Sequence, residues 1–215
     1  MRADLQIIAD WIPVGSRILD LGCGDGTLLS WLREHKQVSG LGVEIDQDSI
    51  IRCIENGVPV VQKNLDTGLK NFRDKSFDVV IMSQSLQQMK APHKTLDEML
   101  RIGREAIVTF PNFGYWNTRR YLFFLGRMPM SKILPYSWFD TPNIHLCTCR
   151  DFERLCRDQK ARIRQNTVLD SQHQSRRIIR WLPNLLGEIA IYHVDKPGTD
   201  ATPSAAANTA PEATA

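Results

Sequence analysis

The sequence predicts an α/β fold, in which a mostly parallel β-sheet carries helices on both of its faces. Segments with the period of a strand alternate with segments with the period of a helix over most of the 215 residues. This alternation is typical of parallel sheets whose strands are connected by helices. In addition, the apolar segment 17–21 passes directly into a turn with three glycines, at residues 22–26. A glycine-rich turn between a buried strand and a helix is typical of ligand-binding sheets of this class.

The first part of the chain is expected to supply three strands and three helices. An amphipathic helix with Leu5, Ile8 and Ile12 on one side ends at Pro13, because proline disrupts a helix interior. The expected elements after it are a strand at 17–21, a helix at 27–34, a strand at 38–45, a helix at 48–55 and a strand at 58–62. The second of these helices stops at Asn56 and Gly57, a favourable C-terminal signal.

The later elements continue the alternation, with one irregular interruption. Residues 77–82 are apolar except for Asp78, which indicates a central strand buried on both faces. The remaining expected elements are a helix that opens at Pro92, a strand at 106–110, a helix that starts at Thr148 with Asp151 as a capping box, and two strands at 162–169 and 186–194. We therefore expect a single domain over residues 1–196, with 113–147 as a lid or insertion. The Ala-, Thr- and Pro-rich residues 197–215 are expected to be disordered.

The glycine-rich turn predicts a site for an adenosine-type cofactor. Gly22, Gly24 and Gly26 carry no Cβ, so a ligand can lie against the backbone. The helix that follows directs its N-terminal amides and its positive dipole end at that ligand. One strand–helix–strand unit later, a second strand ends in Glu44 and Ile45. An acidic residue at this distance commonly binds the two ribose hydroxyls of a nucleoside.

The spacing of the turn distinguishes between cofactors. The dinucleotide fingerprint is G-x-G-x-x-G and places a pyrophosphate at the helix end, whereas this chain has G-x-G-x-G with Asp20 before it. A carboxylate there repels a pyrophosphate but suits the ammonium group of an amino acid. The pattern D-x-G-x-G-x-G followed by G-V-E-I-D resembles the S-adenosylmethionine (SAM) site of Rossmann-like methyltransferases. The alternative is a degenerate nucleotide fold that keeps the glycines only for tight packing.

Three further segments are expected to line the same cleft, because ligands bind outside the carboxyl ends of the strands. Leu65 and Asp66 follow the third strand, Ser83 and Gln84 follow the fourth, and residues 111–113 follow the fifth. We expect the Asp66 carboxylate to accept a hydrogen bond from the adenine amino group. For each segment the alternative is an ordinary polar loop.

Longer segments resemble a single family. Residues 83–87, 110–116 and above all 127–148 are similar to the methionine biosynthesis protein MetW family, and the similarity continues to about Val194. The resemblance implies a seven-stranded Rossmann-like SAM-dependent methyltransferase fold with an antiparallel last strand, and SAM or S-adenosylhomocysteine (SAH) as cofactor. It also implies a role in methionine biosynthesis beside a homoserine O-acyltransferase of the MetX type. Asn64 stands where related SAM sites often carry an acid, and Asp66 is the alternative adenine contact.

The first possible function is methyl transfer. A methyltransferase needs an acceptor pocket and often a base, and proximity alone can drive attack on the reactive sulfonium. The N-P-P-Y-like tetrapeptide that serves amide or exocyclic-amine acceptors is absent after the fourth strand, where residues 83–86 read Ser-Gln-Ser-Leu. His145 is the candidate base, because it follows an aromatic segment that is expected near the cleft mouth. A structural histidine is the alternative there.

The second possible function is a partner protein that senses SAM. Residues 115–127 combine the aromatic and arginine side chains that are favoured at interface hot spots. Arg119, Arg120 and Tyr121 are the hardest of these to bury and are the expected docking residues. Leu122, Phe123 and Leu125 form either part of the same surface or the core of a lid helix.

Composition limits the other function classes. A formal net charge of +3 is too small to indicate a nucleic-acid partner by itself, and the arginines at 176, 177 and 180 are expected in a solvated loop. No apolar run approaches the roughly 18 residues of a membrane span, and the first residues lack a signal-peptide core. The five cysteines are irregularly spaced, so no metal site is expected. These observations favour a reduced, cytoplasmic protein.

Overall fold

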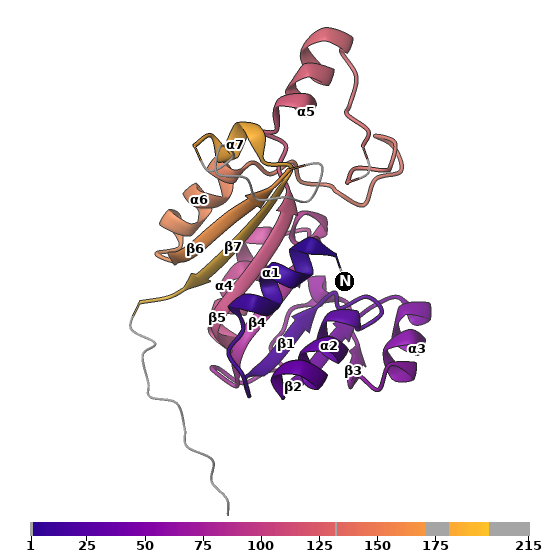
Figure 1. Ribbon diagram of the computed structural model, residues 1–215, viewed down its shortest axis with the longest axis vertical. Coiled ribbons are helices and arrows are strands. Elements are labelled where there is room, and N and C mark those ends of the chain that lie inside the picture. The colour runs from indigo at the N-terminus through magenta and orange to yellow at the C-terminus, as the bar shows by residue number, and fades with distance from the viewer. Residues whose placement is uncertain (1, 132, 171–180, 198–215) are drawn as a thin grey trace, which may run out of the picture.

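The computed structural model describes residues 2–131, 133–170 and 181–197 (Figure 1). Its strands are β1 (Arg17–Leu21), β2 (Ser39–Glu44), β3 (Val60–Gln62), β4 (Phe77–Ser83), β5 (Gly103–Pro111), β6 (Arg162–Leu169) and β7 (Ile189–Asp195). Its α-helices are α1 (Ala3–Trp11), α2 (Thr27–Lys36), α3 (Gln47–Glu55), α4 (Pro92–Ile102), α5 (Trp116–Arg120), α6 (Cys149–Asp158) and α7 (Pro183–Leu186). Single 3-10 turns follow β3 at Leu65–Thr67 and β4 at Leu86–Gln88, and a π-helical turn, Tyr121–Leu125, continues α5.

The described strands form one seven-stranded sheet in the order β3-β2-β1-β4-β5-β7-β6. Neighbouring strands pair in parallel from β3 to β5, whereas β7 runs antiparallel to both β5 and β6. The predicted fold, with its antiparallel last strand, is thus confirmed. The order reverses between β1 and β4, where the chain crosses from one half of the sheet to the other, and this is where open α/β sheets bind ligands.

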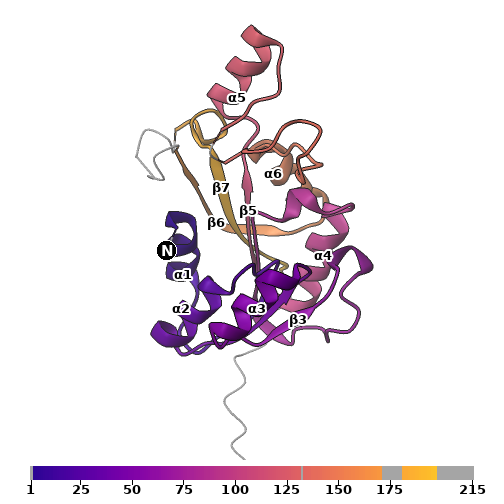
Figure 2. The same ribbon diagram turned by 90° about the vertical axis from the view of Figure 1, so that its right-hand side faces the viewer.

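Helices cover both faces of the sheet, as the sequence predicts (Figure 2). Alternate residues of β1 point to opposite faces: Leu19 packs in the core cluster that contains α4 and α6, and Ile18 packs in the cluster that contains α1 and α2. Residues 79–82 of β4 are all buried. The central strand is therefore enclosed on both sides, which explains why its sequence is a continuous apolar run.

The element boundaries follow local signals in most places. The predicted capping box is present, because the Thr148 hydroxyl accepts from the Asp151 N–H while the Asp151 carboxylate accepts from the Thr148 N–H. The predicted strand at 186–194 is wrong at its start, since Pro183 begins the short helix α7 and the strand begins only at Ile189. Proline at the first helical position is pre-organised for this conformation.

One segment extends beyond the sheet. The helix α5 and the turn 121–125 project from the carboxyl end of β5, and the described residues 126–131 and 133–147 lie between this turn and α6 (Figures 1 and 2). Gly126 ends the helical part with a φ of 58°. The arginine cluster at 176–180 and the predicted tail from 198 onward lie outside the described residues. Over the part of the chain that the structure describes, no helix has both the length and the apolar character of a membrane span.

Candidate functional site

The glycine-rich turn joins β1 to α2 at the point where the strand order reverses. Gly22, Gly24 and Gly26 all have positive φ, at 74°, 57° and 75°. A Cβ on Gly24 would meet no atom of the protein within 4 Å, whereas one on Gly22 would lie 2.8 Å from the Ser85 Oγ and one on Gly26 3.0 Å from the Cys53 Sγ. The three glycines therefore differ in what surrounds them. Gly24 borders open space, and the other two allow close packing against neighbouring segments.

Glu44 connects the end of β2 to this turn. Its carboxylate accepts hydrogen bonds from the backbone N–H groups of Gly24 at 2.8 Å, Ile45 at 2.7 Å and Asp46 at 3.1 Å. The Ile45 side chain beside it is exposed. Glu44 thus fixes the turn against β2, so the acidic residue and the glycines act as one structural unit.

Asp20 lies at the end of β1, beneath the turn, and is paired in register with Gly42 of β2 and Ile81 of β4. It is 3% exposed, and its Oδ1 atom is buried without a hydrogen-bond partner. Burial, and to a smaller extent the negative charge of Glu44, raise the pKa of Asp20 to about 7. No lysine or arginine of the described residues forms an ion pair with it. A buried carboxylate beside a second carboxylate is stabilised by a cation, so the site is suited to a positively charged ligand.

The segment after β3 is organised by its own side chains. The Asn64 Oδ1 accepts from the Asp66 N–H at 2.9 Å, and the Asp66 Oδ1 accepts from the Lys90 N–H, also at 2.9 Å. Leu65 is partly buried against the core. Asp66 therefore joins the turn after β3 to the segment after β4, and it is exposed at this edge of the sheet.

The segment after β4 contains a strained residue. Gln84 has a φ of 58°, which is uncommon for a residue with a Cβ. Its carbonyl accepts from the side-chain amides of Gln87 at 2.7 Å and Gln88 at 3.2 Å, and its N–H donates to the Thr109 carbonyl at 3.0 Å. These bonds hold the backbone in place. Strain that neighbouring contacts maintain in this way is concentrated at functional sites.

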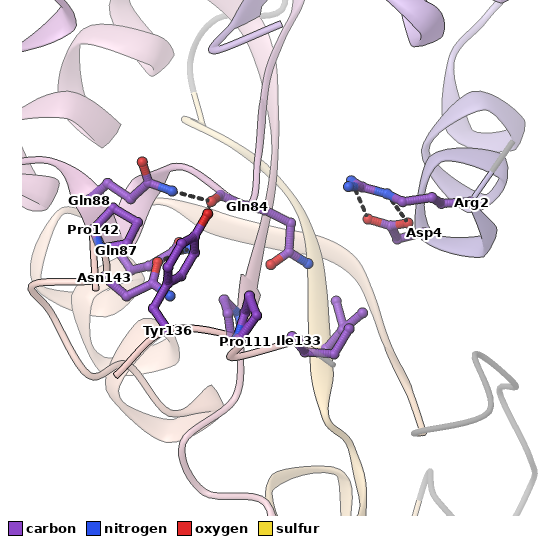
Figure 3. Close-up of a pocket in the computed structure, with 12 residues that line it drawn as sticks. Arg2, Asp4, Gln84, Gln87, Gln88, Pro111, Ile133, Tyr136, Pro142 and Asn143 are labelled. Atoms are coloured by element: carbon purple, nitrogen blue, oxygen red, sulfur yellow. Dashed lines mark hydrogen bonds and ion pairs between the residues drawn. The ribbon is translucent and has the colours of Figure 1, made fainter. Parts of the chain in front are cut away.

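A cavity of about 440 Å³ opens beside this segment, between the ends of β4 and β5, α1 and residues 133–143. The Gln84 side chain reaches into it, toward Pro111 and Ile133, and the Arg2–Asp4 ion pair lies on its far side (Figure 3). Asp4 is itself buried, at 1% exposed. The cavity therefore presents both polar amides and a charged pair to any occupant.

Two of its lining residues were not predicted from the sequence. The buried Gln87 donates from Nε2 to the Asn143 Oδ1 at 3.1 Å, while the Gln87 Oε1 is buried without a partner. The two residues are 56 positions apart, so no local pattern relates them. The sequence indicates Gln84 and Pro111 as cleft residues, and Asp4, an acidic residue in a helix with a buried apolar face, is a further signal for this cavity.

His145, the candidate base, is placed elsewhere. Its N–H donates to the Gln87 carbonyl at 3.0 Å, and it borders a separate hollow of about 200 Å³ together with Leu86 and Phe110. It is not among the residues that line the cavity beside Gln84. In the described residues, no group of three or more histidine, cysteine, aspartate or glutamate side chains is arranged to hold a metal ion.

Comparison with known sequences points to one family. Residues 2–194 match the family described as "Methionine biosynthesis protein MetW". A curated relative from Rhodopirellula baltica, the "Bifunctional methionine biosynthesis protein MetXA/MetW", is 36% identical over 164 residues. The match covers 72% of this chain and 26% of the relative, so the chain spans about a quarter of the length of the curated relative it matches.

Solved structures share the fold at low sequence identity. A SAM-dependent methyltransferase from Thermotoga maritima is 18% identical, with a TM-score of 0.63 over 90% of this chain and 87% of that one. A S-adenosylmethionine-dependent methyltransferase from Mesorhizobium loti is also 18% identical, with a TM-score of 0.62 over 89% and 97%. The [4+2]-cyclase SpnF is 17% identical, with a TM-score of 0.62 over 90% and 80%. The same fold therefore occurs in proteins that are named for different reactions, methyl transfer and [4+2] cyclisation.

Proposed function

The chain belongs to the MetW family of methionine biosynthesis proteins, and we propose that it binds SAM or SAH and supports a homoserine O-acyltransferase of the MetX type. The family match and the methyltransferase-like fold support a role in methionine biosynthesis. The proposed cofactor site consists of the carboxyl ends of β1, β2, β3 and β4 with the turns that follow them.

The environment of Asp20 is the observation that carries the cofactor proposal. Its carboxylate is buried with one oxygen unpartnered, and the Glu44 carboxylate lies close enough to raise its pKa further. SAM carries an ammonium group and a sulfonium centre, and SAH keeps the ammonium. An ammonium group that donates to the Asp20 Oδ1 would satisfy the buried oxygen and compensate the charge.

The remaining predicted residues receive roles in the same proposal. Gly24 borders the space that the ligand backbone occupies, and Glu44 accepts from the ribose hydroxyls in addition to holding the turn. Ile45 and Leu65 flank the adenine ring, and Asp66 accepts from its amino group. Ser83 and Gln84 lie at the end of β4, toward the methionine part of the ligand. The proposed ligand contacts are therefore Asp20, Gly22, Gly24, Gly26, Glu44, Ile45, Leu65, Asp66, Ser83 and Gln84.

A first expected result concerns Glu44. Glu44→Ala should weaken SAM binding by about 1.5–3 kcal/mol, the range for hydrogen bonds to a charged group, because it removes the ribose acceptor and the brace of the Gly24 N–H. Glu44→Gln should cost less. Isothermal titration calorimetry measures both affinities, and a 2′-deoxy analogue provides the control, since its loss of affinity should largely disappear in Glu44→Ala. Equal binding of SAM and the deoxy analogue to the parent protein would contradict the ribose assignment.

The fused relative supports the partner proposal. In the Rhodopirellula baltica protein a MetW part and a MetXA part share one chain, which ensures that the two are held together. SAM is made from methionine, so a protein that binds SAM and contacts an early enzyme can adjust that enzyme through linkage between the two binding events.

The partner proposal is tested by co-purification and an acyltransferase assay. We expect the protein to capture the homoserine O-acyltransferase of the same organism from native extract, and the purified enzyme to be more active with this protein than without it. The assay is repeated with and without SAM to measure the linkage. An acyltransferase that neither binds nor responds would overturn the proposal.

A SAM-dependent methyltransferase acting on a small molecule is the second candidate. The cavity of about 440 Å³ beside Gln84 favours it, because it opens next to the segment that follows β4 and has polar lining groups for an acceptor. His145 is not among the residues that line this cavity, so acid–base catalysis there has no assigned residue. Accumulation of a methylated product by the purified protein alone, from SAM and a cell metabolite extract, would make this the leading function.

A further inference from the structure

The projecting segment that follows β5 exposes an unusual amount of aromatic surface. We call residues 116–131 and 133–146 the arm. Its four most exposed aromatic side chains are Phe123 at 82%, Phe124 at 74%, Trp138 at 73% and Phe139 at 75% exposed. They form two edge-to-face pairs, Phe123 with Phe124 and Trp138 with Phe139. Exposed apolar groups that gather on a protein surface mark interaction sites, and each of these pairs is such a group.

The interpretation of Leu122, Phe123 and Leu125 as the core of a lid helix is wrong. Within the turn Tyr121–Leu125, all of which is described, no side chain is buried. Helices shorter than about 12 residues are marginal in water and depend on packing of an apolar face. This one projects away from both core clusters, so its apolar residues lack that packing within the described part of the chain. Its π-helical turn is a further feature that is frequent at functional sites.

We infer that the arm is the surface that docks the homoserine O-acyltransferase, an inference that rests on the proposed function. Three arginines of the arm, Arg119, Arg120 and Arg127, flank Phe123 and Phe124 in the sequence and are exposed. Asp140 is the one acidic residue in the sequence 113–147. The arm therefore fits a partner with an apolar groove and an acidic rim, since aromatic residues and arginine are enriched at interface hot spots.

The charge of the arm disfavours a second copy of this chain as the occupant. A symmetric contact would place the same surface patch of both copies face to face, which would bring the three arginines of each copy together. Like charges across an interface are strongly unfavourable. An acyltransferase surface with carboxylates avoids this repulsion.

Two of the three arginines also make contacts within this segment of the chain. The Arg119 Nε donates to the Gly114 carbonyl at 2.6 Å, and the Arg120 guanidinium lies over the Trp116 ring, 5.5 Å from its centre. A hollow of about 330 Å³ lies between Arg120, Tyr121, Phe124 and Leu125. A partner side chain inserted there would contact both the aromatic and the basic part of the arm.

The experiment measures binding of the purified acyltransferase to the full-length chain and to two double variants. Phe123→Ser/Phe124→Ser should weaken the complex at least about 30-fold, which corresponds to the roughly 2 kcal/mol of a hot spot. Val14→Ser/Ile54→Ser is the matched control, since both side chains are exposed apolar groups outside the arm, and it should bind normally. Arg119→Ala/Arg120→Ala should also lose affinity, and more so at low salt. All variants should keep SAM affinity, because distant sites behave almost independently.

The outcomes separate the inference from the proposed function. If the parent protein does not bind the acyltransferase, the proposed function fails. If it binds and Phe123→Ser/Phe124→Ser binds equally well, the function stands and the arm is excluded as the docking surface. Light scattering and co-sedimentation with anionic vesicles test the other occupants. Suppose that Phe123→Ser/Phe124→Ser loses self-association or vesicle binding but still binds the acyltransferase as the parent protein does. This result would overturn the inference.

Discussion

Gly24→Val is expected to abolish SAM binding while the protein still folds. A Cβ at this position meets no protein atom within 4 Å, so the added Cβ disturbs no packing. It does place a branched side chain in the space that the ligand must occupy if it lies against the turn. The positive φ of 57° adds strain of about 1–2 kcal/mol. Titration calorimetry on the folded variant measures the loss.

Gly15 provides the matched control for this experiment. Its φ is 75° and a Cβ there also meets no protein atom within 4 Å. Gly15→Val therefore carries the same kind of backbone strain and the same side chain, but outside the proposed site, and it should bind SAM normally. Gly24→Ala covers the case in which the valine variant fails to fold. Parental SAM affinity in a folded Gly24 variant would remove the turn from the cofactor site.

Gly22→Val is expected to lose SAM binding for a different reason. Its Cβ would lie 2.8 Å from the Ser85 Oγ, so the turn and the segment after β4 would have to move apart. We expect a larger loss of thermal stability in Gly22→Val than in Gly24→Val, measured by the unfolding temperature. Comparing the two variants thus distinguishes an obstructed ligand from a distorted site.

SAM affinity is expected to rise with pH up to about 7 and then to level off. The ligand's ammonium group needs an ionised Asp20, whose pKa is raised to about 7. Below that pH, binding must remove the proton, which costs up to tenfold in affinity for each pH unit. Asp20→Asn should bind SAM weakly and without this dependence. Asp25→Asn is the control, because Asp25 is an exposed acid of the same turn and its pKa is lowered.

The free energy of unfolding of the ligand-free protein should have the opposite dependence on pH. The folded pKa of Asp20 lies above its unfolded value of 3.8, so folding takes up a proton between these values. The associated stability is fully present below about pH 4 and is lost as the pH rises through 7, by at most about 4 kcal/mol. Asp20→Asn should remove this loss and be more stable than the parent at pH 8. Urea unfolding at pH 4, 6 and 8 measures the effect, and parallel curves for both proteins would contradict the assignment.

The sequence by itself determined the fold class and the position of the proposed site. Strand and helix periods alternate because each element must bury an apolar face, and this pattern is local enough to be read directly. The turn 22–26 and the acidic end of the next strand are also local signals. The topology brings them together, since parallel strands end at one edge of the sheet and Glu44 bonds to Gly24 there.

Only the tertiary structure decided what these residues contact. The unpartnered oxygen of Asp20, the Gln87–Asn143 bond and the open space beside Gly24 depend on what neighbouring segments place around them. The same holds for residues 121–125, whose aromatic sequence is compatible with either a core or a docking surface. The apolar side chains of a segment determine how much surface it can bury. Whether that surface is buried depends on how distant segments pack against it. For this reason the sequence predicted the sheet and its glycine turn, and the arm emerged as an exposed surface only in the folded molecule.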